Sequence, residues 1–140
     1  MADLAPLIRV RKHDIEQKQK TLAELYRQEE ELKKQRDILE TQLAIESEKT
    51  KDMDAEMLKF FAPYAESVNN QIEEIDGHRA KIEQLITMAQ EDMRAAFAEL
   101  KKIEIIAERR DSEQLAVLDK KDADELDEIA IDAFRRSEQS

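Results

Sequence analysis

Apolar residues recur along the second half of the chain at alternating steps of four and three positions. Starting from Phe61, these steps reach thirteen apolar residues in fourteen positions, and the one polar residue is Arg79. This spacing is typical of a sustained coiled-coil helix with one narrow apolar seam. The fourteen predicted seam positions are Phe61, Ala65, Val68, Ile72, Ile75, Arg79, Ile82, Ile86, Ala89, Met93, Ala96, Leu100, Ile103 and Ala107.

The first half carries a weaker form of the same repeat. One seam position holds Ile8, Ile15, Leu22 and Leu43, and the other holds Leu4, Leu25, Leu32, Leu39 and Met53. Charged residues interrupt this seam at Arg11, Lys18, Glu29, Arg36 and Glu46. Two seams in one chain most simply face each other. The predicted fold is therefore all-α, an elongated antiparallel two-helix coiled-coil hairpin with an overhanging C-terminal helix.

The bend is predicted between about 48 and 64, where a polar run interrupts the first seam. We expect a single coiled-coil domain over 1–140, with helix one at about 4–49, the bend at about 50–63 and helix two at about 64–136. Asp52 or Asp54 can cap a new helix, and Pro63 is expected near a helix start. Two geometries stay open: a loop at 50–54 with a kink at Pro63, or one irregular bend spanning both. Gly77 is expected to lie inside the second helix.

Composition supports this fold. Charged residues make up 41% of the chain, against about 25% in an ordinary globular domain, and only one Gly and two Pro occur. Cysteine is absent, which excludes disulfides and thiolate sites. Because the sequence also lacks a signal-peptide pattern and a membrane-length apolar run, a cytoplasmic protein is expected.

The net charge of −11 is unevenly distributed. Residues 1–20 carry five basic and three acidic residues, a balance of +2, whereas residues 111–140 carry four basic and ten acidic residues, a balance of −6. This asymmetry makes it plausible that the two ends lie side by side. The basic and aromatic pattern of a nucleic-acid-binding protein is missing.

Catalytic chemistry is not predicted. A two-helix coiled coil offers no concave site in which catalytic groups could converge, so we predict no catalytic residues, no cofactor and no small-molecule substrate. His13 and His78 fall outside both seams and are expected to be surface residues rather than metal ligands.

Several apolar residues lie outside the seam positions. Two interpretations stay open: these residues widen the seam, or they form a contact strip for a partner protein. Phe60 and Tyr64 are the better candidates for a contact, because the end of a hairpin covers them least. The full set is Ile38, Ile45, Phe60, Tyr64, Leu85, Phe97, Ile105 and Ile106.

Three ordered segments resemble the FliJ family, the small coiled-coil proteins of the bacterial flagellar type III export apparatus. Residues 96–110, AFAELKKIEIIAERR, resemble the family's second helix, and residues 124–130, DELDEIA, resemble its closing acidic motif. Residues 58–68, LKFFAPYAESV, are similar to its aromatic entry into that helix. Pro63 and the short hairpin loop depart from the usual family pattern.

The resemblance implies a non-catalytic component peripherally associated with the inner membrane at the flagellar base. It implies three partners: the ring of the FliI-like export ATPase, the cytoplasmic domain of the FlhA-like export gate membrane protein, and export chaperones. The chain ends are expected to enter the ATPase ring, and the hairpin side is expected to meet the gate. Alternatives are the equivalent stalk protein of a virulence type III secretion system and a general helical-hairpin scaffold or holding chaperone. The predicted partner-binding residues are Ile38, Phe60, Tyr64, Val68, Arg109 and Arg110.

Overall fold

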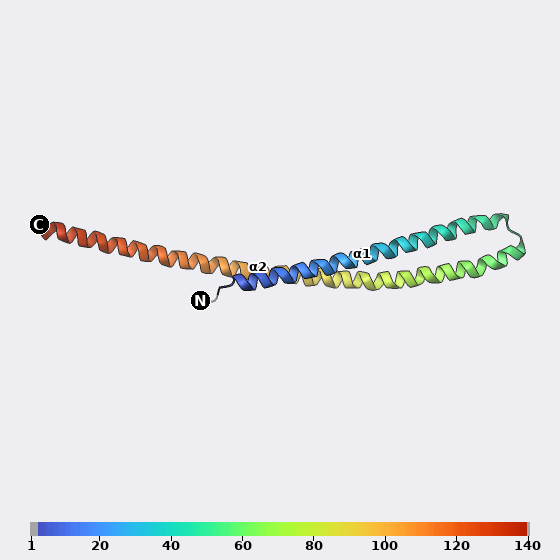
Figure 1. Cartoon of the computed structure of the whole chain (residues 1–140), viewed down its shortest axis with the longest axis horizontal. Helices are drawn as coiled ribbons and strands as arrows, with labels where there is room; N and C mark the ends of the chain where they lie inside the picture. Colours follow the sequence, from blue (N-terminus) through green and yellow to red (C-terminus); the bar gives the residue numbers. More distant parts are fainter. Residues whose placement is uncertain (1–2, 140) are drawn as a thin grey trace. The chain divides into compact units, whose positions relative to one another are not determined.

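Two long helices make up nearly all of the computed structural model, which describes residues 3–139 (Figure 1). Helix α1 spans Ala5–Lys49, the short 3-10 helix η1 spans Thr50–Asp52, and α2 spans Ala55–Gln139. No strand occurs in these described residues. The two long helices pack against each other, so the predicted all-α helical hairpin is confirmed.

The contacts divide the chain into two units. We call His13–Ala96 the hairpin unit, and Met1–Lys12 together with Phe97–Ser140 the terminal unit. Each unit contains a segment of α1 and a segment of α2, and each is described by itself below. The prediction of a single domain stays a prediction.

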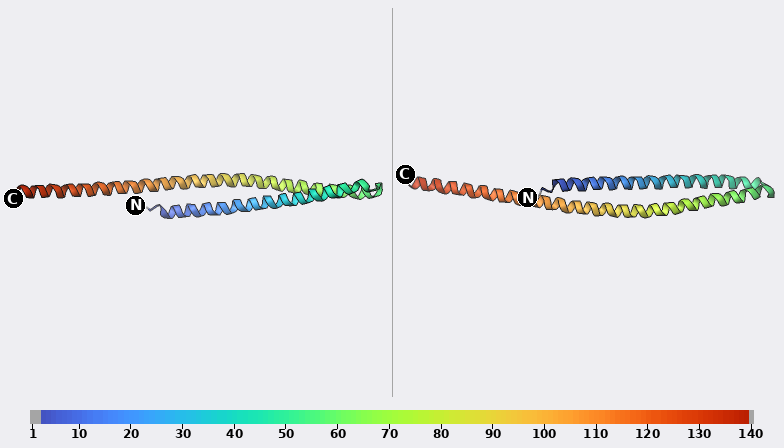
Figure 2. Two further views of the ribbon diagram at one scale, coloured as in Figure 1. Left: turned by 90° about the horizontal axis from the view of Figure 1, so that it is seen from above. Right: turned by 60° about the horizontal axis from the view of Figure 1, so that its bottom comes forward.

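In the hairpin unit, α1 and α2 run antiparallel and lie side by side in both views of Figure 2. All of the seam positions predicted from Phe61 to Ala96 are buried or half-buried, with Val68 4% and Ile86 7% exposed. Between them the residues are exposed, except for Gln90. Because this alternation repeats every three or four residues, the predicted register of the α2 seam is confirmed.

The polar interruptions of the first seam lie within the seam itself. Lys18, Glu29, Arg36 and Glu46 are all half-buried, and the apolar seam residues beside them are half-buried or, at Ile15, buried. The long side chains of such residues can pack their aliphatic stems against the partner helix while the charged ends stay wet. The buried stripe of α1 is therefore continuous along the helix, although it contains both apolar and charged residues.

Two polar contacts join the helices of the hairpin unit. Arg36 Nε donates to Asp76 Oδ1 at 2.7 Å, and Gln90 Nε2 donates to the Tyr26 hydroxyl at 2.8 Å. The hydrogen bond to Asp76 raises the pKa of the Arg36 guanidinium, with a smaller contribution from Glu40. Each contact joins residues far apart in the sequence, so together they favour one alignment of α1 against α2.

The bend is shorter than the predicted span of 50–63. After η1, Met53 donates its N–H to the Thr50 carbonyl oxygen at 3.2 Å, and α2 begins at Ala55. Asp54 caps α2, because its Oδ1 accepts the N–H of Met57 at 2.9 Å. Residues 55–63 are helical, which favours the alternative of a loop at 50–54.

Pro63 lies inside α2 rather than at a helix start, so that expectation was wrong. The fixed φ of proline is compatible with a helix, although its ring removes one hydrogen bond. The Asp54 cap starts the helix two turns earlier than the proline rule alone predicts. Gly77 lies within α2 as expected, and a Cβ added there would meet no atom within 4 Å beyond its chain neighbours and the surrounding helix backbone.

In the terminal unit, the first turns of α1 cover only part of α2. Leu100 and Ile103 are each 8% exposed, and Ala107 is half-buried. Every described side chain from Glu108 to Glu138 is exposed. Because α2 continues to Gln139, about eight further turns of helix have exposed side chains over 108–138.

Candidate partner-binding surfaces

Seven of the nine exposed large hydrophobic residues of the hairpin unit lie on one side of the seam by their heptad positions. Tyr64 and Leu85 immediately precede the seam residues Ala65 and Ile86, and Met88 lies three residues beyond Leu85. In an antiparallel pair of helices, the positions that precede the first seam residue of each heptad line the same side on both helices. The positions two residues after that seam residue lie next to them on the helix surface. We call this set the apolar face. Its members are Ile38, Ile45, Met57, Phe60, Tyr64, Leu85 and Met88.

A shallow groove of about 370 Å³ opens on the apolar face beside the bend. Phe60 is 81% exposed at this groove, and the rings of Phe61 and Tyr64 pack with their centroids 6.2 Å apart. The groove presents apolar and aromatic surface with one carboxylate. Its lining residues are Glu46, Met53, Met57, Phe60, Phe61 and Tyr64.

A second groove continues this side between α1 and α2 farther from the bend. It is lined by Gln28, Glu31, Leu32, Gln35, His78 and Ile82, so glutamine and apolar side chains make up most of the lining. His78 is an exposed residue of this groove, and Glu31 is the one acidic residue in the lining. The predicted surface position of His78 is therefore confirmed.

The other side of the hairpin unit is charged. Arg36 is held there by both Glu40 and Asp76, and Glu83 follows seven residues after Asp76. Tyr26 is the exposed aromatic residue on this side, and its hydroxyl is engaged by Gln90. The two sides therefore differ in chemistry, and the apolar face is the one suited to a protein contact.

The predicted contact residues of the hairpin unit have different environments. Ile38 and Phe60 are exposed, and Tyr64 is 37% exposed. Val68 is buried in the seam, where it packs between the helices and offers no surface to a partner. The role of all four residues in partner binding stays a prediction.

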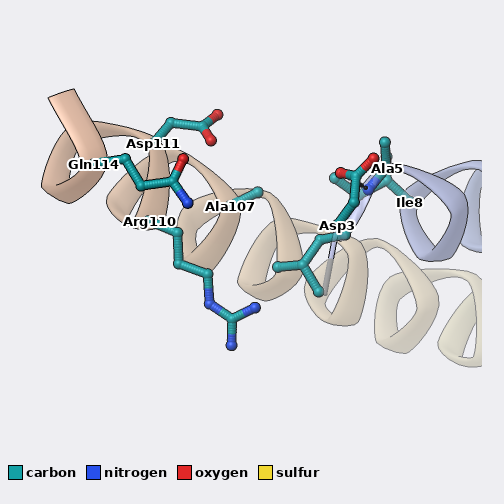
Figure 3. Close-up of a pocket in the computed structure, with 8 residues that line it drawn as sticks. Asp3, Ala5, Ile8, Ala107, Arg110, Asp111 and Gln114 are labelled. Atoms are coloured by element: carbon teal, nitrogen blue, oxygen red, sulfur yellow. Dashed lines mark hydrogen bonds between the residues drawn. The ribbon is translucent and has the colours of Figure 1, made fainter. Parts of the chain in front are cut away.

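Arg109 and Arg110 are exposed in the terminal unit and form no ion pair with any described residue. Arg110 lines a pocket at the start of α1, and Figure 3 shows its side chain pointing away from that of Asp111. The pocket also contains Asp3, whose carboxylate accepts the N–H of Ala5 at 3.0 Å. The two guanidinium groups are thus free to meet acidic groups, but their predicted role is untested.

An apolar stripe on the exposed part of α2 was missed in the sequence. Leu115, Leu118, Leu126 and Ile129 are between 55% and 66% exposed. Continuing the seam by steps of three and four from Ala107 leads instead to Arg110, Gln114 and Val117. Leu115 and Leu118 each lie one residue later, about 100° around the helix. We call these four leucine and isoleucine residues the C-terminal stripe; their own spacing of three, eight and three residues was the available signal.

The described residues hold no cluster of three or more His, Cys, Asp or Glu side chains able to bind a metal ion. His13 lies 3.9 Å from a carboxylate oxygen of Glu16, an exposed pair on one turn of α1. Within residues 3–139, neither long helix has an apolar stretch of the length needed to span a bilayer.

The family of the chain follows from a comparison that covers nearly its whole length. The profile of the flagellar FliJ protein family matches residues 1–139. No significant match to the chain is found among curated proteins or among solved structures. The matched length agrees with the two-helix fold and with the resemblance of the three sequence segments. The chain therefore belongs to the FliJ family and is a component of the flagellar protein export apparatus.

Proposed function

We propose that this protein couples the export ATPase ring to the export gate and escorts export chaperones, acting by protein binding rather than by catalysis. The observation that carries the proposal is the apolar face of the hairpin unit, which leaves Phe60 81% exposed beside a groove. A ring that is exposed to this extent contributes little to the stability of the hairpin unit. A protein partner that buries the ring would recover its transfer free energy.

The export gate is the proposed partner of the apolar face. Ile38, Phe60 and Tyr64 supply large side chains there, and the neighbouring groove has one acidic residue, Glu31, in its lining. A partner segment with apolar residues and few charges fits such a surface, because burying an unpaired charge is costly. Val68 contributes by holding α2 against α1 beneath Tyr64.

The ATPase ring is the proposed partner of the terminal unit. Arg109 and Arg110 present unpaired guanidinium groups, and residues 111–140 carry a net charge of −6. The ring is expected to meet both features, with acidic groups near the arginines and basic groups around the C-terminal stripe. Association with the inner membrane is then indirect, through the gate and the ring.

Two binding assays on the same purified variants test this assignment. Tyr64→Ala should weaken binding to the gate's cytoplasmic domain by about 2 kcal/mol if Tyr64 is a hot spot, and leave ring binding intact. Arg109→Glu combined with Arg110→Glu should do the converse. Glu66→Ala, a change at an exposed position near Tyr64, is the matched control and should affect neither assay. A folded Tyr64→Ala protein that binds the gate with unchanged affinity would refute the gate assignment.

A further inference from the structure

The first two turns of α2 make few contacts with the rest of the hairpin unit. Every residue from Asp54 to Phe60 is exposed, and Phe61 is the first half-buried residue. Asp54 holds the start of the helix through its side chain and through its carbonyl oxygen, which accepts the N–H of Leu58 at 3.1 Å. The helicity of this segment therefore depends on its own backbone hydrogen bonds and one cap, with little help from burial.

Pro63 separates this segment from the well-packed part of α2. Proline has no N–H, so the Lys59 carbonyl oxygen lacks the helical donor that any other residue at position 63 would supply. The pyrrolidine ring also disfavours the helical conformation of Ala62. Beyond the proline, burial resumes at Ala65 and is nearly complete at Val68.

We propose that residues 55–62 form a separately opening segment, which unfolds locally while the remainder of the hairpin unit stays folded. Opening removes the helical turns that carry Met57 and Phe60 and uncovers Phe61. Opening therefore changes the shape of the groove beside the bend, because these three residues line it together with Met53 and Tyr64. This opening is a conformational equilibrium of the unbound protein and requires no partner.

Hydrogen exchange of the full-length protein, under conditions where exchange reports the opening equilibrium, tests the proposal. The amides of Leu58–Ala62 should exchange at least 100-fold faster than those of Ile72–Ile86, relative to their unstructured rates. Pro63→Ala restores the missing donor, so it should slow exchange at Leu58–Ala62 at least tenfold. It should leave exchange at Ile72–Ile86 within about twofold of the parent.

Gly77→Ala is the matched control, because it also introduces a good helix former into α2 but does so within the well-packed part. Local opening predicts that Gly77→Ala leaves Leu58–Ala62 unchanged. If Gly77→Ala slowed exchange at Leu58–Ala62 as much as Pro63→Ala does, the segment would open only with the whole unit and the proposal would be wrong. Equal protection of the two amide sets in the parent protein would overturn it as well.

Discussion

Arg36 of α1 reaches Asp76 of α2 across the hairpin seam, with Nε 2.7 Å from Oδ1, although forty positions separate the two residues in the sequence. Their side chains are 29% and 45% exposed, so water screens the pair. The contact contributes more to the choice of register than to the free energy of folding, because partly exposed ion pairs stabilise weakly.

A double-mutant cycle with Arg36→Ala and Asp76→Ala should give a weak coupling energy, of the size measured for solvent-exposed ion pairs. The measurement is urea denaturation of the parent, both single variants and the double variant, monitored by circular dichroism. A coupling energy as large as that of a buried ion pair would contradict the screened geometry. The pair should hold throughout the neutral range, because Asp76 raises the pKa of Arg36 and the guanidinium stays charged until the pH passes that raised value.

Adjacent residues of α2 offer a sharp test of the seam. Ile86 is 7% exposed whereas Leu85 is 48% exposed. Ile86→Ala should therefore cost about 2 kcal/mol or more, through lost burial and a cavity, while Leu85→Ala should cost no more than about 0.5 kcal/mol. Denaturant midpoints measured at a constant slope check both values. Equal costs at the two positions would show that the register is displaced.

Gly77→Ala should stabilise the protein by about 0.5–1 kcal/mol. The added methyl group meets no atom within 4 Å beyond its chain neighbours and the surrounding helix backbone, and alanine loses less backbone entropy than glycine when the helix forms. The thermal midpoint of the circular dichroism signal should rise. A fall in that midpoint would indicate a close approach at Gly77 that the structure does not contain.

Glu24 provides a prediction of pH dependence. The hydrogen bond from Arg27, whose Nη2 lies 2.6 Å from Glu24 Oε1, holds the pKa of the Glu24 carboxyl below its usual value of 4.5, and Gln28 adds to the effect. A depressed pKa means that the pair stabilises the fold above 4.5 and that this contribution is lost as the pH falls through the lowered pKa. An NMR titration should show the Glu24 midpoint rising in Arg27→Gln. Lys33→Gln is the control and should leave that midpoint unchanged.

The C-terminal stripe should affect binding without affecting the hairpin unit. Leu126→Asp combined with Ile129→Asp adds charge to two side chains that are already exposed, so the seam loses no packing. The denaturant midpoint of the hairpin unit should stay within about 0.5 kcal/mol of the parent, since surface changes rarely cost more. Binding to the ATPase ring should weaken at least tenfold, as measured by co-sedimentation or calorimetry.

A control matched in charge is Lys120→Gln combined with Lys121→Gln, which makes the same change of −2 in net charge nearby without touching the stripe. If both double variants weakened ring binding equally, the effect would be due to net charge and the stripe would have no specific role.

Local sequence signals were sufficient for the helices and the seam. The three-and-four repeat from Phe61 to Ala107 predicted which α2 residues are covered, because a helix face depends only on residue spacing and on the helical period. The interrupted α1 seam could be aligned for the same reason, even where Arg36 or Glu46 replaces an apolar residue. The bend at 50–54 was one of two alternatives, and Asp54 as a cap was a local signal for it.

Only the tertiary structure decided how the two helices meet. The Arg36–Asp76 and Tyr26–Gln90 contacts join residues between which no local pattern exists, so the alignment of α1 against α2 depends on packing along the entire seam. The same alignment brings Ile38 and Tyr64 to one side, which spacing within either helix alone does not determine. Pro63 was predicted near a helix start because the local rule considers only the free-energy cost of the missing hydrogen bond. Whether the helix continues through the proline also depends on the Asp54 cap before it and on the packed seam after it.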